Sequence, residues 1–203
     1  VQLTDINGDG YVDYVTSQSE GRMTVRYNQA AKTNLLRKVT NFTGSYFEMD
    51  YDMPLACYDK AQRSWNLASV ETHNNVAACP VGGNSTLTTF EYESPNYNRY
   101  ERMDYGYERV TTYQHDPENN GDVYRYTVEE FNNRDFNKRG RKTRDCLYDE
   151  YDNPYVEHIY GDTLYDFAGS EVSDGGCART DVYVGREADI TNWYEGYPTP
   201  QLT

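Results

Sequence analysis

Apolar and polar residues alternate along most of the chain in short segments that are rich in Tyr, Thr and Val. Clusters of Asn, Gly, Asp or Pro separate these segments at short intervals, and helical periodicity is nearly absent. Alternation with a period of two is typical of β-strands, and frequent turn clusters are typical of antiparallel connections. The pattern predicts an all-β fold built of antiparallel hairpins and meanders, with little helix.

The clearest hairpin is predicted at residues 35–51, where two strand-like segments flank the turn sequence Asn41-Phe42-Thr43-Gly44. Gly44 supplies the positive φ that such a turn needs. Because alternate residues of a strand lie on one face, we expect one buried face to carry Phe47, Met49 and Tyr51.

The same pattern predicts further strands and one interruption. A loop-rich insertion at residues 54–84 contains Trp65 and one short helix around Ser64 to Val70. The further strands are expected at residues 86–93, 99–113 with a bend at Gly106, 123–131, 141–148, 155–160, 180–184 and 189–194.

Composition and charge narrow the class of function. The 203 residues include 22 Tyr, and aromatic residues make up 15% of the chain, which argues against disorder. No segment approaches the roughly 20 apolar residues of a membrane-spanning helix. The net charge of −14 would repel nucleic acid and anionic lipid. We therefore expect no membrane span and no nucleic-acid partner.

The four cysteines have neither C-x-x-C spacing nor neighbouring His residues, which argues against a zinc site. Two disulfides could pair them in three ways. We favour Cys57–Cys79 and Cys146–Cys177, because each bond would close a loop rich in Asn, Gly and Ser. The alternative is four small buried thiols.

One motif near the start suggests a metal site: Asp5-Ile6-Asn7-Gly8-Asp9-Gly10-Tyr11-Val12-Asp13. Oxygen ligands at alternate positions converge on a hard cation when the chain wraps around it, so we expect Ca²⁺ as a structural ion. No Glu stands at the twelfth position and the flanks are strand-like, unlike an EF-hand. The alternative is an Asx-rich turn without metal. The expected ligands are Asp5, Asn7, Asp9, the carbonyl of Tyr11 and Asp13.

Catalytic patterns are absent from the sequence, which contains no G-x-S-x-G, H-E-x-x-H, P-loop or G-x-G-x-x-G motif. His73, His115 and His158 lie far apart and are interpreted as surface imidazoles. A pair of carboxylates flanking a sugar, or a Tyr and Trp platform that binds carbohydrate, are weaker alternatives. The basic cluster at residues 134–144 is expected to pair with neighbouring acids.

Several segments, in order, resemble one family of bacterial toxins. The Asp-rich motif is similar to the calcium loop of FG-GAP/VCBS propeller repeats. The following segments resemble the B subunits of insecticidal toxin complexes and the Salmonella plasmid virulence protein B family: residues 35–44 with 47–51, 89–92, 100–102, 105–110 and 136–141. Tyr107 stands where the family has Phe, the cysteine-bearing insertion departs from the pattern, and nothing beyond Tyr160 matches.

The resemblance implies that propeller repeats precede strands that spiral into a hollow shell around a toxic C-terminal polypeptide. Residues 1–16 would then end an FG-GAP/VCBS-like calcium repeat, and residues 17–203 would begin a curved, shell-like sheet similar to Rhs-type shells. We therefore expect a non-catalytic, secreted or cell-surface bacterial segment. Its partners would be other domains of a longer polypeptide or a toxin-complex subunit. The alternative is a surface adhesin that binds glycan or protein through Tyr and Trp.

Overall fold

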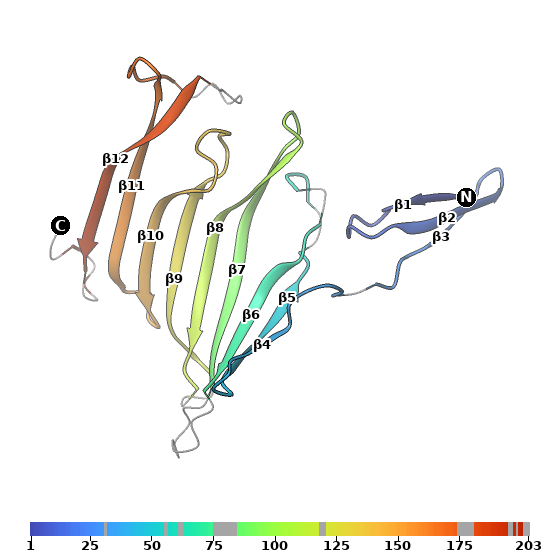
Figure 1. The fold of residues 1–203 in the computed structure, drawn as a ribbon, viewed down its shortest axis with the longest axis horizontal. Coiled ribbons are helices and arrows are strands. Elements are labelled where there is room, and N and C mark those ends of the chain that lie inside the picture. The colour runs from blue at the N-terminus through green and yellow to red at the C-terminus, as the bar shows by residue number, and fades with distance from the viewer. Residues whose placement is uncertain are drawn as a thin grey trace.

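Two antiparallel sheets make up the fold in the computed structural model, which describes residues 1–30, 32–54, 57–60, 63–74, 85–117, 121–173, 181–194, 197 and 199–200. The described residues contain no helix, and so none that could span a membrane. The smaller sheet lies beside the larger one and is joined to it by an extended segment (Figure 1). The prediction of an all-β, antiparallel fold is confirmed.

The smaller sheet has three strands in the order β1-β2-β3. Gly21 has a φ of 78° in the tight turn between β2 and β3, a backbone conformation that favours glycine. Val15 and Asp13 of β2 are buried. The strand bounds are β1 Gln2–Thr4, β2 Asp13–Ser19 and β3 Arg22–Arg26.

The larger sheet is a nine-stranded meander in which every strand pairs with its neighbours in the sequence, from β4 at one edge to β12 at the other. Strands that the turn clusters separate in the sequence are therefore antiparallel neighbours in the sheet. The bounds are β4 Lys38–Thr40, β5 Tyr46–Asp52, β6 Asn66–His73, β7 Ser85–Asn98, β8 Met103–His115, β9 Val123–Asn132, β10 Arg141–Asp149, β11 Pro154–Asp166 and β12 Val182–Trp193.

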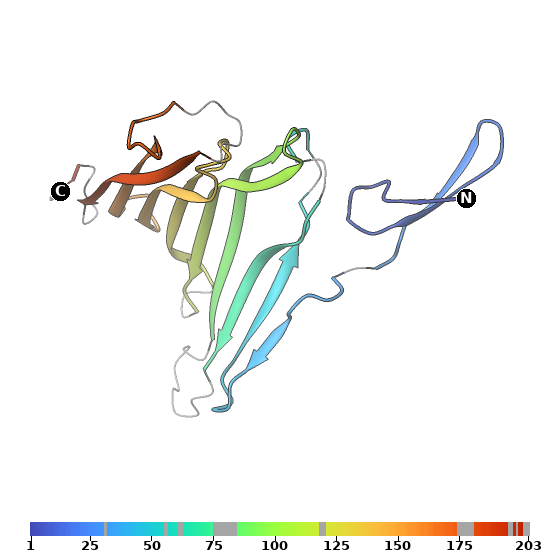
Figure 2. The same cartoon turned by 45° about the horizontal axis from the view of Figure 1, so that its top comes forward.

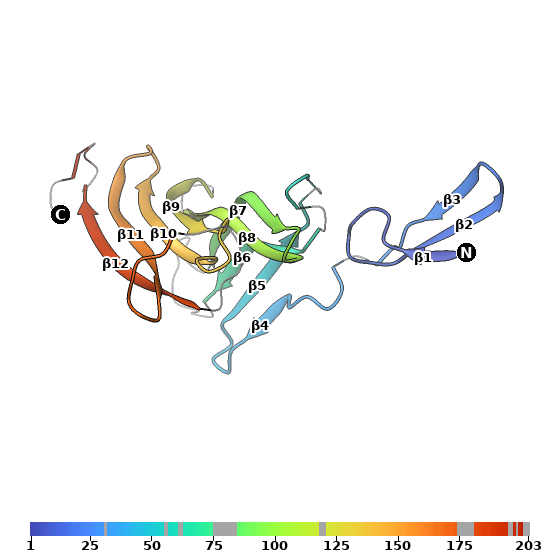
Figure 3. The same cartoon turned by 90° about the horizontal axis from the view of Figure 1, so that it is seen from above.

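The larger sheet is a single curved layer, as Figures 2 and 3 show. The chain exposes 13512 Å² of surface, whereas a compact monomer of its mass would expose about 9,800 Å². Few apolar side chains are buried among the described residues, because no second layer packs on the sheet. They are Val15, Tyr105, Val128, Cys146 and Leu164.

Local shifts in strand register accompany the curvature. One shift, at Asn96/Tyr97 of β7, lies opposite Gly106 of β8, whose φ is 84°. An extra residue in one strand bends it and increases its twist, so the predicted bend at Gly106 is confirmed. The other shifts occur at Asp50/Tyr51, Gln114/His115, Lys142/Arg144, Leu147/Tyr148 and Gly161/Asp162.

The predicted hairpin at residues 35–51 is confirmed in the pair β4 and β5. The turn closes through a hydrogen bond from the Asn41 N–H to the Ser45 carbonyl, and Gly44 has a φ of 86°. Phe47, Met49 and Tyr51 are only half-buried, and the Tyr51 hydroxyl donates to the Leu36 carbonyl in the segment before β4.

The predicted helix around Ser64 to Val70 is wrong. This segment contributes strand β6, in which Val70 lies between Met49 of β5 and Thr88 of β7. Backbone pairing on both sides of β6 outweighs the weak local preference of Asn66-Leu67-Ala68-Ser69. The two short strands predicted at residues 180–184 and 189–194 are likewise one strand, β12, with a bulge near Glu187.

The two favoured disulfides are not formed, because Cys57 and Cys146 are free thiols. Cys79 and Cys177, their predicted partners, lie outside the described residues. Cys57 is exposed, whereas Cys146 is buried in the middle of β10 between Val128 of β9 and Glu157 of β11. Its strand position explains the error, since the prediction had placed Cys146 at the base of a closed loop.

Candidate functional site

A ladder of alternating charges crosses one face of the larger sheet. Arg109 on β8 pairs with Glu93 on β7 at 3.4 Å and with Glu130 on β9 at 3.9 Å. Arg144 on β10 pairs with Glu130 at 3.6 Å and with Glu157 on β11 at 2.5 Å. Opposite charges on neighbouring strands stabilise a sheet much as apolar pairs do. We call these five residues the charge ladder and the face that carries them the ladder face.

Glu157 is the buried end of the charge ladder, with only 9% of its side chain exposed. Its Oε1 accepts from Nε of Arg144, and its Oε2 accepts from Asn192 at 3.0 Å and from Tyr194 at 2.8 Å. Burial alone would raise the pKa of Glu157, but the bonds from Asn192, Arg144 and Tyr194 outweigh it and leave that pKa lowered. Glu157 is thus a satisfied anion that joins β10, β11 and the end of β12.

A buried row runs beside the charge ladder. Its members are direct register partners on successive strands, so they share the ladder face. All five side chains are buried, and their order across the strands is Thr111, Val128, Cys146, Glu157 and Asn192. Small and polar groups therefore fill the positions where a two-layer protein would place large apolar residues.

Three neighbouring tyrosines continue the ladder face toward the other end of the strands. Tyr126 of β9 lies between Tyr113 of β8 and Tyr148 of β10, with ring centroids 5.6 and 4.9 Å apart. Desolvation, followed by the hydrogen bond from its hydroxyl to Asp152, raises the pKa of Tyr126. Tyr126 therefore has an aromatic neighbour on each side.

The opposite face of β10 to β12 has its own ionic network. Asp162 accepts from Nε of Arg141 at 2.8 Å and from Nε of Arg186 at 3.1 Å. The hydrogen bond from Arg141 and the further bond from Arg186 lower the pKa of Asp162 to about 2, against the opposing effect of burial. The Arg186 guanidinium also lies 4.4 Å from the ring centroid of Tyr160. Both faces of this part of the sheet are therefore held by polar contacts.

The electrostatics of the described carboxyl groups do not resemble those of a catalytic acid. Catalytic carboxylic acids need a raised pKa to hold a proton near neutral pH. Every carboxyl group with a clearly shifted pKa in the described part of the chain is shifted downward, by hydrogen bonds or by neighbouring cations. These groups are Asp13, Glu48, Asp50, Asp149, Glu157 and Asp162.

Four of the predicted metal ligands lie in the loop between β1 and β2, and the fifth, Asp13, is the first residue of β2. Asp5 accepts from the N–H groups of Gly8 at 2.7 Å and Gly10 at 2.8 Å, which fold the loop around its carboxylate. Asp9 accepts from the N–H of Tyr11 and from the side-chain amide of Asn7. Asp13 instead joins the loop to the segment after β3, because it accepts from Ile6 and Asn28 N–H.

The loop supplies the oxygen donors that Ca²⁺ prefers, and a carboxylate has about four lone-pair positions, so one N–H bond does not exhaust an oxygen. In this arrangement, however, the described residues contain no group of three or more His, Cys, Asp or Glu side chains positioned to hold a metal. Asp13 is fully buried with both oxygens hydrogen-bonded. The calcium site therefore stays a prediction.

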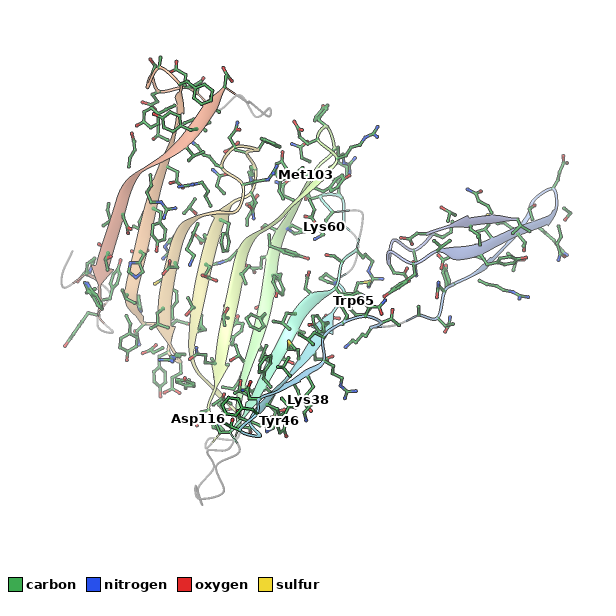
Figure 4. All side chains as sticks on the ribbon, viewed as in Figure 1. Lys38, Tyr46, Lys60, Trp65, Met103 and Asp116 are labelled. Carbon is green, nitrogen blue, oxygen red and sulfur yellow. The ribbon has the colours of Figure 1, made fainter. Side chains whose placement is uncertain are left out.

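The same loop contacts two connecting segments, the one between β3 and β4 and the one between β5 and β6. The carbonyl of Gly8 accepts from the Arg63 N–H at 2.8 Å, and the Tyr11 hydroxyl lies 3.1 Å from that of Thr33. Trp65, which Figure 4 shows where the two sheets approach, has Lys32 Nζ 5.9 Å from its ring centroid. Figure 4 also shows Lys38 and Tyr46 close together, where the Lys38 ammonium lies 3.5 Å from the ring centroid.

The histidines are less exposed than predicted, and each has a strand partner. His73 stacks on Tyr46, His115 Nε2 lies 2.9 Å from the Thr89 hydroxyl, and His158 Nδ1 lies 2.9 Å from that of Thr191. They lie on β6, β8 and β11, and no two of them share a site among these contacts.

Four of the six bases in the cluster at residues 134–144 pair with acids, as expected, whereas Arg139 lies over the rings of Phe136 and Tyr105. Arg134 bonds to Glu108, Arg141 to Asp162, Lys142 to Glu129 and Arg144 to Glu157. The sequence revealed neither these partners nor the charge ladder, because the carboxylates come from strands whose register the sequence does not specify.

Comparison with known proteins gives a consistent result. The family described as "Insecticide toxin TcdB middle/N-terminal region" matches residues 1–134. Solved structures of TcdB2-TccC3, and of TcdB2-TccC3 without its hypervariable C-terminal region, match with TM-scores of 0.64 and 0.66 at 13% and 14% identity. The Tc holotoxin pore of Photorhabdus luminescens matches with a TM-score of 0.65 at 13% identity.

These structural matches concern a small part of much longer proteins. Each covers 96% of this chain but 12% of the matched chain. At identities of 13% and 14%, the structural similarity shows a shared fold. No curated protein sequence matches the chain significantly.

Proposed function

The chain belongs to the family of the insecticide toxin TcdB middle/N-terminal region, and we propose that it is a non-catalytic wall segment of a secreted, toxin-like bacterial protein. In this proposal the larger sheet contributes to a β shell that encloses or delivers a C-terminal toxic polypeptide. Its partners are other domains of the same long polypeptide or a toxin-complex subunit.

The observation that carries this proposal is a curved single-layer sheet with polar networks on both faces. The charge ladder holds one face, and Asp162 with its two arginines holds the other. A wall between two aqueous spaces needs this property, because neither face is sealed by an apolar layer. The lowered carboxyl pKa values support a structural role over a catalytic one.

The test uses the full-length protein and measures how fast a protease digests its C-terminal polypeptide. We expect the polypeptide to be protected in the natural protein. Arg144→Glu should remove that protection, because it places three carboxylates together on β9, β10 and β11. Arg134→Glu is the matched control, since Arg134 has 76% of its side chain exposed and lies outside the charge ladder. Rapid digestion of the polypeptide in the natural protein would contradict the proposal.

A surface binding module is the second candidate, favoured by exposed aromatic residues on the last two strands. Trp193, Tyr183 and Tyr155 are 47%, 47% and 43% exposed. Saturable glycan or protein binding that Trp193→Ala abolishes would favour this alternative. Trp65 is half-buried, which makes Trp65→Ala a weaker probe.

We further propose that the loop between β1 and β2 holds one structural Ca²⁺. The support is the chemistry of its donors: the side-chain oxygens of Asp5, Asn7 and Asp9 all accept backbone N–H groups of this one short loop. The carbonyl of Tyr11 would complete this set. Asp13 would become a ligand only if the ion replaced one of the hydrogen bonds that it accepts from the Ile6 and Asn28 N–H groups.

A further inference from the structure

A pocket of about 410 Å³ lies on the ladder face of β5, β6 and β7, bounded on one side by the segment before β4. This volume is within the range of small-molecule sites. The floor is built from register partners, which share the ladder face: Glu48 with Glu71 and Leu87, and Asp50 with Ser69. These strands lie inside the chain, so the pocket does not depend on where the sequence begins or ends.

The segment at residues 32–37 is fixed to the sheet at both of its ends. Lys32 Nζ bonds to the Asp50 carboxylate at 2.7 Å. The Arg37 carbonyl accepts from the Met49 N–H at 2.8 Å. Side chains of this segment are therefore held beside the floor of the pocket.

Two carboxylates face each other across the floor. Glu48 of β5 and Glu71 of β6 are direct register partners, and like charges placed directly opposite each other destabilise a sheet. Lys38 Nζ lies 2.9 Å from Glu48 Oε1, and His73 Nε2 lies 3.2 Å from Glu71 Oε1. These contacts engage one oxygen of each carboxylate, so the other oxygens are able to accept from an ammonium group.

The pocket also contains donors that the protein does not use. Throughout the described part of the chain, the Arg37 guanidinium has no hydrogen bond or ion pair, and the Ser69 hydroxyl has no hydrogen bond. The hydrogen bond from Lys38 lowers the pKa of Glu48, and the positive charge of Arg37 contributes in the same direction. An unpaired guanidinium close to the two acids is suited to a bidentate contact with a carboxylate.

We propose that this pocket binds a free α-amino acid with an apolar side chain. Its ammonium group lies between Glu48 and Glu71, where it relieves their repulsion, and its carboxylate bonds to Arg37. Its side chain lies against Leu35 and Leu87, the leucines that line the pocket. This inference goes beyond the proposed wall role and does not rest on it, because every group it uses belongs to one pocket.

The experiment is an NMR titration of the 203-residue chain that follows the backbone amides of Ser69 and Leu87. The three ligands are L-leucine, leucine amide, which lacks the carboxylate, and N-acetylleucine, which lacks the ammonium group. L-Leucine should bind saturably. The other two should bind about tenfold more weakly, since each loses one charged partner.

Two substitutions test the two charged contacts separately. Arg37→Gln should weaken L-leucine about tenfold and leave leucine amide unchanged. Glu71→Gln should weaken L-leucine and leave N-acetylleucine unchanged. A folding defect would weaken all three ligands alike, so these differences report the contacts themselves. Arg22→Gln, which removes the same charge from an exposed position on β3, is the matched control and should change nothing.

Three results would overturn the proposal. They are no binding of L-leucine up to about 10 mM, equal affinity for the three ligands, and an equal loss of L-leucine and leucine amide in Arg37→Gln. None of them bears on protease protection in the full-length protein, so this proposal and the proposed function fail separately.

Discussion

Arg144 and Glu157 form a hydrogen-bonded ion pair, 2.5 Å between Nε and Oε1, on adjacent strands of a sheet that has no covering layer. In a two-layer protein, such central positions hold apolar residues that pack against the second layer. Here the pair joins Glu130 on one side and Asn192 with Tyr194 on the other. Polar contacts therefore supply the cohesion between β9, β10, β11 and the end of β12.

Replacing Glu157 by Ala should destabilise the larger sheet. The change leaves the donors of Arg144, Asn192 and Tyr194 without their acceptor. Breaking one side of a buried ion pair costs about 3 kcal/mol, and urea unfolding should show a fall of this order in the free energy of unfolding. Glu187→Ala, on the exposed part of β12, should change it by less than about 0.5 kcal/mol.

Replacing both members of the pair should recover much of that loss. In the double variant Arg144→Met with Glu157→Leu, no charge is left unpaired, and apolar contact replaces the ion pair. We expect the double variant to unfold at a higher urea concentration than Glu157→Ala. An additive loss in the double variant would mean that Arg144 and Glu157 act independently.

The pKa of Asp162 predicts how the sheet responds to acid. Its pKa of about 2 in the folded state lies below the usual Asp pKa of 3.8, so the folded state favours the charged form. This contribution, about 2 kcal/mol, is present above pH 4 and is lost as pH falls from 4 toward 2. The Asp162→Asn variant should lack this contribution at all pH values. The difference in unfolding free energy between the natural protein and the variant should therefore shrink as pH falls from 4 toward 2. A constant difference would contradict the assignment.

Gly106→Ala should destabilise the bend in β8 through the backbone alone. Its φ of 84° disfavours a residue with a side chain, whereas the nearest atom to an added Cβ, Nδ2 of Asn133, would lie 3.6 Å away. We expect a loss of about 1–2 kcal/mol in urea unfolding. Gly106→Asn should lose less, because Asn tolerates this conformation better. Equal losses would point to the contact with Asn133 as the cause.

The calcium proposal predicts a change in melting temperature when divalent ions are removed with a chelator. Free Ca²⁺ at 100 times its Kd adds about 2.7 kcal/mol to the stability of the unit that binds it. Asp9→Asn should make melting insensitive to the chelator. Glu20→Gln removes one charge from the β2–β3 turn without touching the loop, and should leave the sensitivity intact. No effect of the chelator on the unmodified chain would contradict the proposal.

Local signals explain what the sequence could predict of the fold. Gly44 and Gly140 mark turns between alternating segments, and both turns exist, because a hairpin needs only its own residues to form. The error at Ser64 to Val70 arose because β6 depends on two neighbours, one of them beyond residues 75–84. The length of β12 was missed because Gly185 and Glu187 interrupt the alternating pattern of the sequence. The pairing with β11, which continues on both sides of Glu187, is not visible in the sequence.

The candidate site was harder to predict because it depends on register. Glu93, Arg109, Glu130 and Arg144 are separated by 14 residues or more along the chain, and a shift of one residue would place any of them on the other face. The sequence could have offered one signal, since Arg109, Glu130 and Arg144 stand two residues from Thr111, Val128 and Cys146. Those three small or apolar residues mark the buried row.

The strict order of the meander has a consequence for how the protein forms during synthesis. From β4 to β12, each strand docks on the one made just before it, so the loops that must close are short and the contact order is low for an all-β architecture. Each new hairpin can add to the preceding ribbon while the ribosome is still working. Vectorial growth of this kind lets a long polypeptide build its β structure progressively, without waiting for its last residues.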